Sequence, residues 1–71
     1  MPEISALAKR VKAYRESLGE TQFELSGEIG ISIEELSLIE RGEANPRLST
    51  MQKIAAHMGI TVSALLEVEE V

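Results

Sequence analysis

The side chains that could catalyse a reaction are few and widely spaced in this sequence. Nucleophilic catalysis needs a serine or threonine beside a histidine and an orienting acid. The only histidine, His57, lies in the middle of a helical pattern with no signature around it, so we expect a surface residue. Adjacent acids such as Glu34 and Glu35 point about a quarter turn apart on a helix and form no catalytic pair. With no cysteine and no glycine-rich phosphate loop, the chain is predicted to have no catalysis, metal or cofactor.

A binding function has stronger support, from two short helices that a tight turn separates. Thr21 is the expected N-cap of a helix over 22–29, because its hydroxyl oxygen can accept a bond from a free backbone amide. Gly30 can then enter the left-handed region without steric cost and turn the chain. Ser32 caps the second helix, which is predicted to run over 33–41.

The apolar residues of segment 21–41 have the spacing of an inward face that two such helices would share. They are Leu25, Ile29, Ile31, Leu36 and Ile39. The arrangement is that of a helix-turn-helix, whose second helix can enter the major groove of DNA.

A longer helix is predicted before this segment, from about residue 4 to residue 18. Apolar residues recur there at steps of three and four, which gives the helix one apolar face. They are Leu7, Val11, Tyr14 and Leu18.

Two shorter helices are predicted after it. The glycine, asparagine and proline that follow residue 41 indicate a loop, and Leu48 then begins a buried return. The next helix opens at Pro46 or Ser49, and Thr61 caps a last short helix. Residues 1–71 are therefore expected to form one all-α domain of five helices.

The composition limits the location and the partners of the protein. A net charge of −5 is of the wrong sign for a nucleic-acid binder judged by total charge, although local phosphate contacts decide counterion release. No apolar run approaches membrane-spanning length and the N-terminus lacks a secretory pattern. We expect a cytoplasmic protein that does not bind membranes.

The order of residues across the chain resembles the Xre/Cro-type helix-turn-helix family of phage repressors and bacterial regulators. In and just after the central segment, the matching residues are Gln22, Leu25, Gly30, Ile31, Leu36, Ile39, Glu40, Arg41, Gly42, Asn45 and Pro46. Further matches are Arg10, Val11, Arg15 and Gly19 upstream, and Leu48, Ile54, Ala55, Gly59, Ile60, Leu65 and Leu66 downstream. The resemblance implies a compact repressor-like domain that binds double-stranded DNA and regulates transcription.

The resemblance also implies which residues hold the DNA backbone and which pair with one another. The expected backbone contacts are Arg10, Gln22, Arg41, Asn45 and Arg47. Arg15 and Glu40 correspond to a partly buried ion pair of the family, which is structural and locks the first helix against the third.

Base reading is expected from the first turns of the third helix. The residues at those places are Ser32, Ile33, Glu34, Ser37 and Leu38. Ile33 and Leu38 can pack on thymine methyl groups, and Glu34 can accept from the amino group of cytosine. Glu34 and Glu35 also bring negative charge towards the phosphates.

A helix-turn-helix domain of this size commonly reads a two-part site as a dimer. The last segment, 60–71, offers apolar residues beyond those that one core needs, and we expect a homodimer through Val62, Leu65, Leu66 and Val68.

The same residues allow a second interpretation, in which the fold is a protein-interaction module of the antitoxin or anti-repressor kind. Ile33 and Leu38 would form an exposed apolar patch rimmed by glutamates, which suits a protein partner. Phe23 occupies a place that the family usually leaves polar; it either joins this patch or folds back on Tyr14 or Leu18. The sequence leaves both interpretations open.

Overall fold

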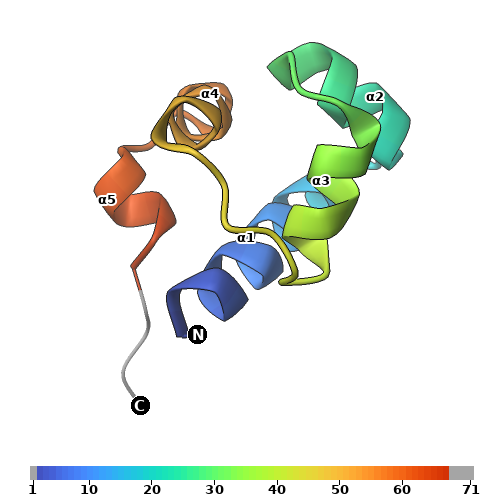
Figure 1. Ribbon diagram of the computed structural model, residues 1–71. Helices are drawn as coiled ribbons and strands as arrows, with labels where there is room; N and C mark the ends of the chain where they lie inside the picture. Colours follow the sequence, from blue (N-terminus) through green and yellow to red (C-terminus); the bar gives the residue numbers. More distant parts are fainter. Residues whose placement is uncertain (1, 68–71) are drawn as a thin grey trace.

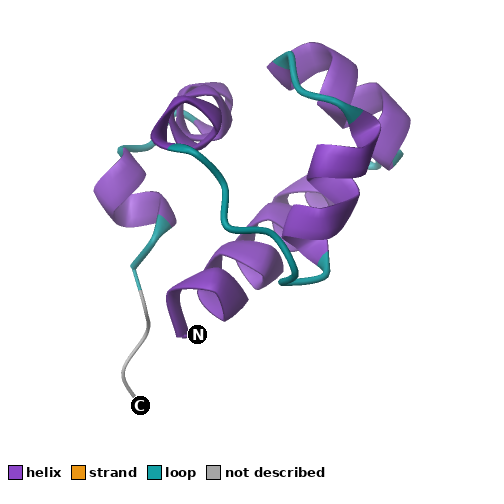
Figure 2. Cartoon of the chain, in the orientation of Figure 1, coloured by secondary structure: helices purple, strands orange, loops and turns teal. Residues whose placement is uncertain are grey.

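The elements of the fold follow the predicted order. The computed structural model describes the backbone of residues 2–67 and the side chains of residues 6–67. Within this range all regular structure is helical (Figure 2). The helices are α1 (Pro2–Leu18), α2 (Gln22–Ile29), α3 (Ile33–Glu40), α4 (Leu48–Met58) and α5 (Val62–Leu65).

Side-chain caps fix where the short helices begin. The Thr21 hydroxyl accepts the backbone N–H of Glu24 at 3.1 Å, and the Glu24 carboxylate accepts the N–H of Thr21 at 2.9 Å. This reciprocal pair satisfies two amides that the first turn of α2 would otherwise leave free. Ser32 and Thr61 cap α3 and α5 through their hydroxyl groups.

Gly30 ends α2 as predicted, with φ +90°. Its N–H and that of Ile31 both donate to the carbonyl of Ser26, at 2.9 and 3.0 Å. Only glycine adopts this left-handed conformation readily, so the tight turn between α2 and α3 depends on it.

One apolar core joins the five helices. In Figure 1, α2 and α3 stand on one side of α1, and α4 and α5 stand on the other, with the loop after α3 crossing between them. The core contains Leu7, Val11, Leu25, Ile29, Leu36, Ile39, Ile54, Ala55 and Leu65. No helix in the described part of the chain is both long enough and apolar enough to cross a membrane.

Two residues that were predicted to face inward do not. Leu18 is 45% exposed and Leu48 is 58% exposed. Leu18 is the last residue of α1 and Leu48 is the first of α4, and the residues beside each are exposed as well. Helical periodicity gives the direction of a side chain, but it does not say whether a neighbouring element extends that far.

Candidate nucleic-acid interface

A shallow hollow of about 490 Å³ lies on the outer side of the helix-turn-helix. We call it the α3 face. It is lined by Gln22, Ile33, Glu34, Ser37, Leu38 and Arg41. Ile33 and Leu38 are 38% and 37% exposed, so their side chains reach solvent. The structure thus brings most of the residues predicted to contact DNA to one surface.

The opposite side of α3 holds the helix in place. Leu36 and Ile39 are buried in the core, and the Glu35 carboxylate accepts a hydrogen bond from the Thr50 hydroxyl at 2.8 Å. Glu35 is therefore drawn towards α4. Glu35 is not among the residues that line the α3 face, and the expectation that it brings charge to phosphates stays a prediction.

The predicted contact between Arg15 and Glu40 is present and is bidentate. Arg15 Nε lies 2.8 Å from Glu40 Oε2, and Nη2 donates to Oε1 at 2.9 Å. The two side chains are only 16% and 3% exposed. The hydrogen bonds that Arg15 donates to the Glu40 carboxylate, together with the negative charges of Glu40 and Glu16, raise the pKa of Arg15. The guanidinium remains charged, and α1 is tied to the end of α3.

The same carboxylate positions Gln22. The side-chain amide of Gln22 donates to Glu40 Oε1 at 3.2 Å, and Arg15 Nη1 donates to the backbone carbonyl of Glu20 at 2.8 Å. One partly buried network therefore fixes the start of α2 relative to α1 and α3.

The other predicted backbone contacts lie apart from this network. Asn45 and Arg47 are exposed in the loop between α3 and α4. Arg41 lies 3.3 Å from the Glu43 carboxylate, and both side chains are 58% exposed. This exposed pair is solvated, so its charges interact weakly.

Arg10 has a structural partner that the sequence did not reveal. Its Nη1 donates to the backbone carbonyl of Leu65 at 2.6 Å, which joins α1 to the last turn of α5. A guanidinium has five N–H donors, so this bond leaves others for a phosphate.

His57 is half-buried in a polar contact, not at the surface as expected. Its Nδ1 lies 2.7 Å from the Tyr14 hydroxyl, and the Tyr14 hydroxyl also donates to the His57 carbonyl at 3.0 Å. Nε2 of His57 is 3.3 Å from the Glu28 carboxylate. The hydroxyl of a tyrosine on an apolar helix face needs a polar partner, and this was the one signal for the contact in the sequence.

The predicted dimer residues have different positions. Leu65 is completely buried in the core of one chain, so its assignment to a dimer interface was wrong: a side chain without exposed surface cannot contact a partner. Val62 and Leu66 are partly buried against the same core. Val68 lies outside the described residues.

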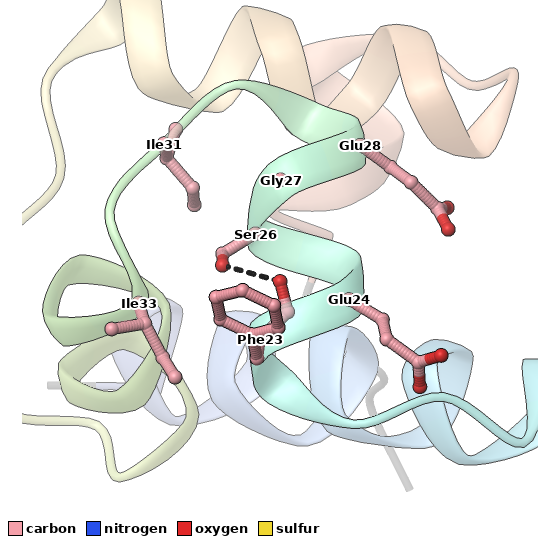
Figure 3. A pocket seen from close by; sticks show the side chains of 7 residues that line it. All are labelled: Phe23, Glu24, Ser26, Gly27, Glu28, Ile31 and Ile33. Atoms are coloured by element: carbon pink, nitrogen blue, oxygen red, sulfur yellow. Dashed lines mark hydrogen bonds between the residues drawn. The ribbon is translucent and has the colours of Figure 1, made fainter.

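Phe23 does not fold back on Tyr14 or Leu18. It is 74% exposed, and it lies beside Ile33 at the lip of a second hollow (Figure 3). The alternative in which it folds back on one of these residues was therefore wrong.

Known proteins share this sequence pattern and this fold. A family model described as helix-turn-helix matches residues 11–65. The HTH-type transcriptional regulator DdrOP3 of Deinococcus deserti is 41% identical over 86% of this chain and 47% of its own length. The immunity repressor protein of Bacillus phage phi105 is 38% identical over 84% of this chain and 42% of its own. This chain thus spans about half the length of the curated relatives that it matches.

A solved structure agrees with both findings. The crystal structure of the hypothetical transcription factor NHTF from Neisseria superposes with a TM-score of 0.81 at 31% identity, covering 92% of this chain and 75% of that one. The predicted all-α repressor-like fold is confirmed. On its sequence and its fold, the chain belongs to the Xre/Cro-type helix-turn-helix family.

Proposed function

We propose that this chain is a sequence-specific DNA-binding regulator of transcription that acts without catalysis or a cofactor. The observation that carries the proposal is the α3 face, where residues from the start of α2 and the outer side of α3 meet on one accessible surface. The names of the relatives, which include HTH-type transcriptional regulators and an immunity repressor, support it.

In this proposal α3 lies in the major groove and the residues around it hold the two phosphate backbones. Gln22 contacts one backbone at the start of α2, where free amides and the helix dipole favour an anion. Arg41, Asn45 and Arg47 contact the other backbone, and Arg10 supplies a further phosphate contact.

Base reading falls to the exposed side of α3. Ile33 and Leu38 are exposed enough to pack on thymine methyl groups, and Glu34 accepts from a cytosine amino group. Ser32 and Ser37 supply hydroxyl groups that bond to either kind of base.

The regulator acts in the cytoplasm as a homodimer that reads two half-sites about one helical turn apart. Val62 and Leu66 are the remaining described candidates for the contact between subunits, because each is only partly covered by its own chain. Sedimentation of the free protein, and a footprint over both half-sites, test this part.

DNA binding is tested with the duplex upstream of the protein's own coding region, over a series of salt concentrations. Affinity is expected to fall steeply with salt, because phosphate contacts release counterions. Arg47→Ala should reduce the slope of log K against log salt by about one, and Gln22→Ala should weaken binding to all sequences alike.

Lys12→Ala is the matched control, because it removes the same charge from an exposed position on α1. If affinity does not respond to salt, the proposed phosphate contacts are absent; if Lys12→Ala lowers the slope as much as Arg47→Ala, then Arg47 does not hold a phosphate beside the α3 face.

A further inference from the structure

The second hollow runs across α2 beside the α3 face, and we call it the α2 groove. Its volume is about 490 Å³. It is lined by Phe23, Glu24, Ser26, Gly27, Glu28, Ile31 and Ile33. Phe23 and Gly27 are four residues apart within α2, so they lie on one side of the helix, and Ile31 follows them after the turn at Gly30. The side chains of Phe23 and Ile31 thus lie on either side of Gly27, which has no side chain (Figure 3).

Gly27 forms this gap at a cost to the helix. It lies inside α2, and a Cβ atom at this position would meet no heavy atom within 4 Å. Glycine within a helix is less stable than alanine, because its backbone loses more conformational freedom on folding. Neither the packing nor the backbone conformation requires a glycine here. A glycine does allow another molecule to approach the helix backbone closely.

Phe23 forms one wall of the groove and is poorly covered by its own chain. Its side chain is 74% exposed, although burial of a phenylalanine side chain is favourable. The Ser26 hydroxyl donates to the Phe23 carbonyl at 3.0 Å (Figure 3), so the polar group nearest to the ring is satisfied within α2. An apolar side chain from a partner can therefore pack on the ring without leaving this hydroxyl unpaired.

The other border of the groove is acidic. Figure 3 shows Glu24 and Glu28 projecting from the side of α2 away from Ile33, and both are exposed. Glu20 lies beside them: the neighbouring carboxylate of Glu28, burial and the charge of Glu24 raise the pKa of Glu20. No lysine or arginine lines the groove. The charge at this border favours a cation and disfavours phosphate.

We propose that the α2 groove binds a cationic segment of a partner protein, which places a bulky apolar side chain over Gly27 and a lysine or arginine beside Glu24 and Glu28. A second copy of this chain fits less well, because pairing the same surfaces across a two-fold axis would bring the glutamates of both copies to one border.

Such a segment would also compete with DNA. Ile33 lines both the α2 groove and the α3 face, so an occupant of the groove covers the start of α3. The competition with DNA rests on the proposed function, whereas the binding of a cationic segment in the α2 groove does not.

The test uses the whole chain and a fluorescein-labelled synthetic helical peptide of leucine, lysine and alanine, with leucines on one face and lysines along its borders. Fluorescence anisotropy is expected to show saturable binding that weakens with salt. In heteronuclear NMR spectra, the amide signals of α2 and the turn over 30–33 should move. A peptide with glutamate for every lysine, and one with alanine for every leucine, should each bind about tenfold more weakly or worse.

Gly27→Leu is the decisive variant, because it fills the gap where a side chain meets nothing. It should weaken peptide binding about tenfold or more while its thermal midpoint stays the same or rises. Leu48→Ser is the matched control: it removes an apolar side chain that is 58% exposed outside the groove and should leave peptide affinity unchanged.

Three results would overturn the proposal. One is an affinity that Gly27→Leu leaves unchanged; another is equal binding of the glutamate peptide. The third is self-association of the free protein that Gly27→Leu abolishes, which would make a second copy the occupant.

In a separate competition experiment, the peptide is added to a preformed complex of the chain with DNA. We expect the DNA to be released. The peptide titration contains no DNA, so failure to bind DNA leaves the test of the α2 groove intact. Conversely, if the chain binds DNA but does not bind the peptide, the proposed function stands and the proposal for the α2 groove is contradicted.

Discussion

At the scale of single residues, the same kinds of side chain have different consequences in buried and exposed places. Arg15 and Arg41 each pair with a glutamate. The first pair is almost enclosed, with side chains 16% and 3% exposed, and the second is 58% exposed on both sides. Removing one partner of an enclosed pair leaves a charge without compensation, whereas water replaces the partner of an exposed one.

Arg15→Ala is therefore expected to lower the free energy of unfolding by about 3–5 kcal/mol. Urea denaturation followed by circular dichroism measures the loss. Arg41→Ala is the control and should cost less than about 1 kcal/mol. Similar losses in the two variants would show that the contact with Glu40 does not lock α1 against α3.

Glu20 provides a prediction about pH. Because Glu28 and burial raise the pKa of Glu20 in the folded chain, the folded state binds a proton more tightly than the unfolded state. Stability should therefore fall as pH rises from the ordinary pKa of a glutamate to the raised one, and stay lower above it.

Glu20→Gln removes this effect, because a glutamine amide can donate to the Glu28 carboxylate without titrating. The variant should be more stable than the parent chain at neutral pH and lose that advantage below the ordinary pKa of a glutamate. Glu16→Gln, on the exposed side of α1, is the control. A stability gain that does not change with pH would contradict the assignment.

At the scale of elements, each short helix is defined by its ends. Thr21 and Ser32 cap α2 and α3, and Gly30 supplies the turn between them. These residues act on the backbone beside them, so the sequence alone predicted the helix-turn-helix almost to the residue.

The two glycines of this element should respond in opposite ways to alanine. Gly27→Ala is expected to stabilise the chain by roughly 0.5–1 kcal/mol, because it removes backbone freedom from the unfolded state and meets no neighbour. Gly30→Ala should destabilise it, because φ is +90° there. Thermal unfolding of the pair tests this, and a destabilising Gly27→Ala would mean that the gap in α2 is needed for folding.

Apart from the Arg15–Glu40 pair, which the family resemblance implied, contacts between distant elements were beyond prediction. Arg10 and Leu65 are 55 residues apart, and Tyr14 and His57 are 43 apart. Helical periodicity indicates which way such side chains point, but their partners depend on how the helices pack. The same reason explains the wrong expectations for Leu18 and Leu48.

The candidate site was predictable only in part. The residues of the α3 face followed from the position of α3 and from the family resemblance. The α2 groove did not, because a glycine within a helix and an exposed Phe23 each look incidental until the fold places them side by side.

At the scale of the whole molecule, the negative net charge of the chain bears on the proposed binding of DNA. The net charge is −5, so affinity must come from a local arrangement of basic residues against general repulsion. Glu34 lies on the α3 face itself, where in the proposed complex its charge would oppose the phosphates most directly.

Glu34→Gln is accordingly expected to strengthen binding to DNA of unrelated sequence several-fold at low salt. Electrophoretic mobility shifts with a random duplex measure the change. Glu16→Gln changes the net charge equally from an exposed site on α1 and should have a smaller effect. Equal effects of the two substitutions on affinity would show that the total charge of the chain, and not the charge on the α3 face, controls binding to this DNA.

The carboxylate of Glu40 bonds at once to Arg15 of α1 and to Gln22 of α2 from its own place at the end of α3. One carboxylate therefore connects three helices. We expect α2 and α3 to have the same relative arrangement before and after a ligand binds. Little ordering entropy is left to lose on association. We expect the backbones of the free and bound domains to differ by less than about 1 Å over these helices.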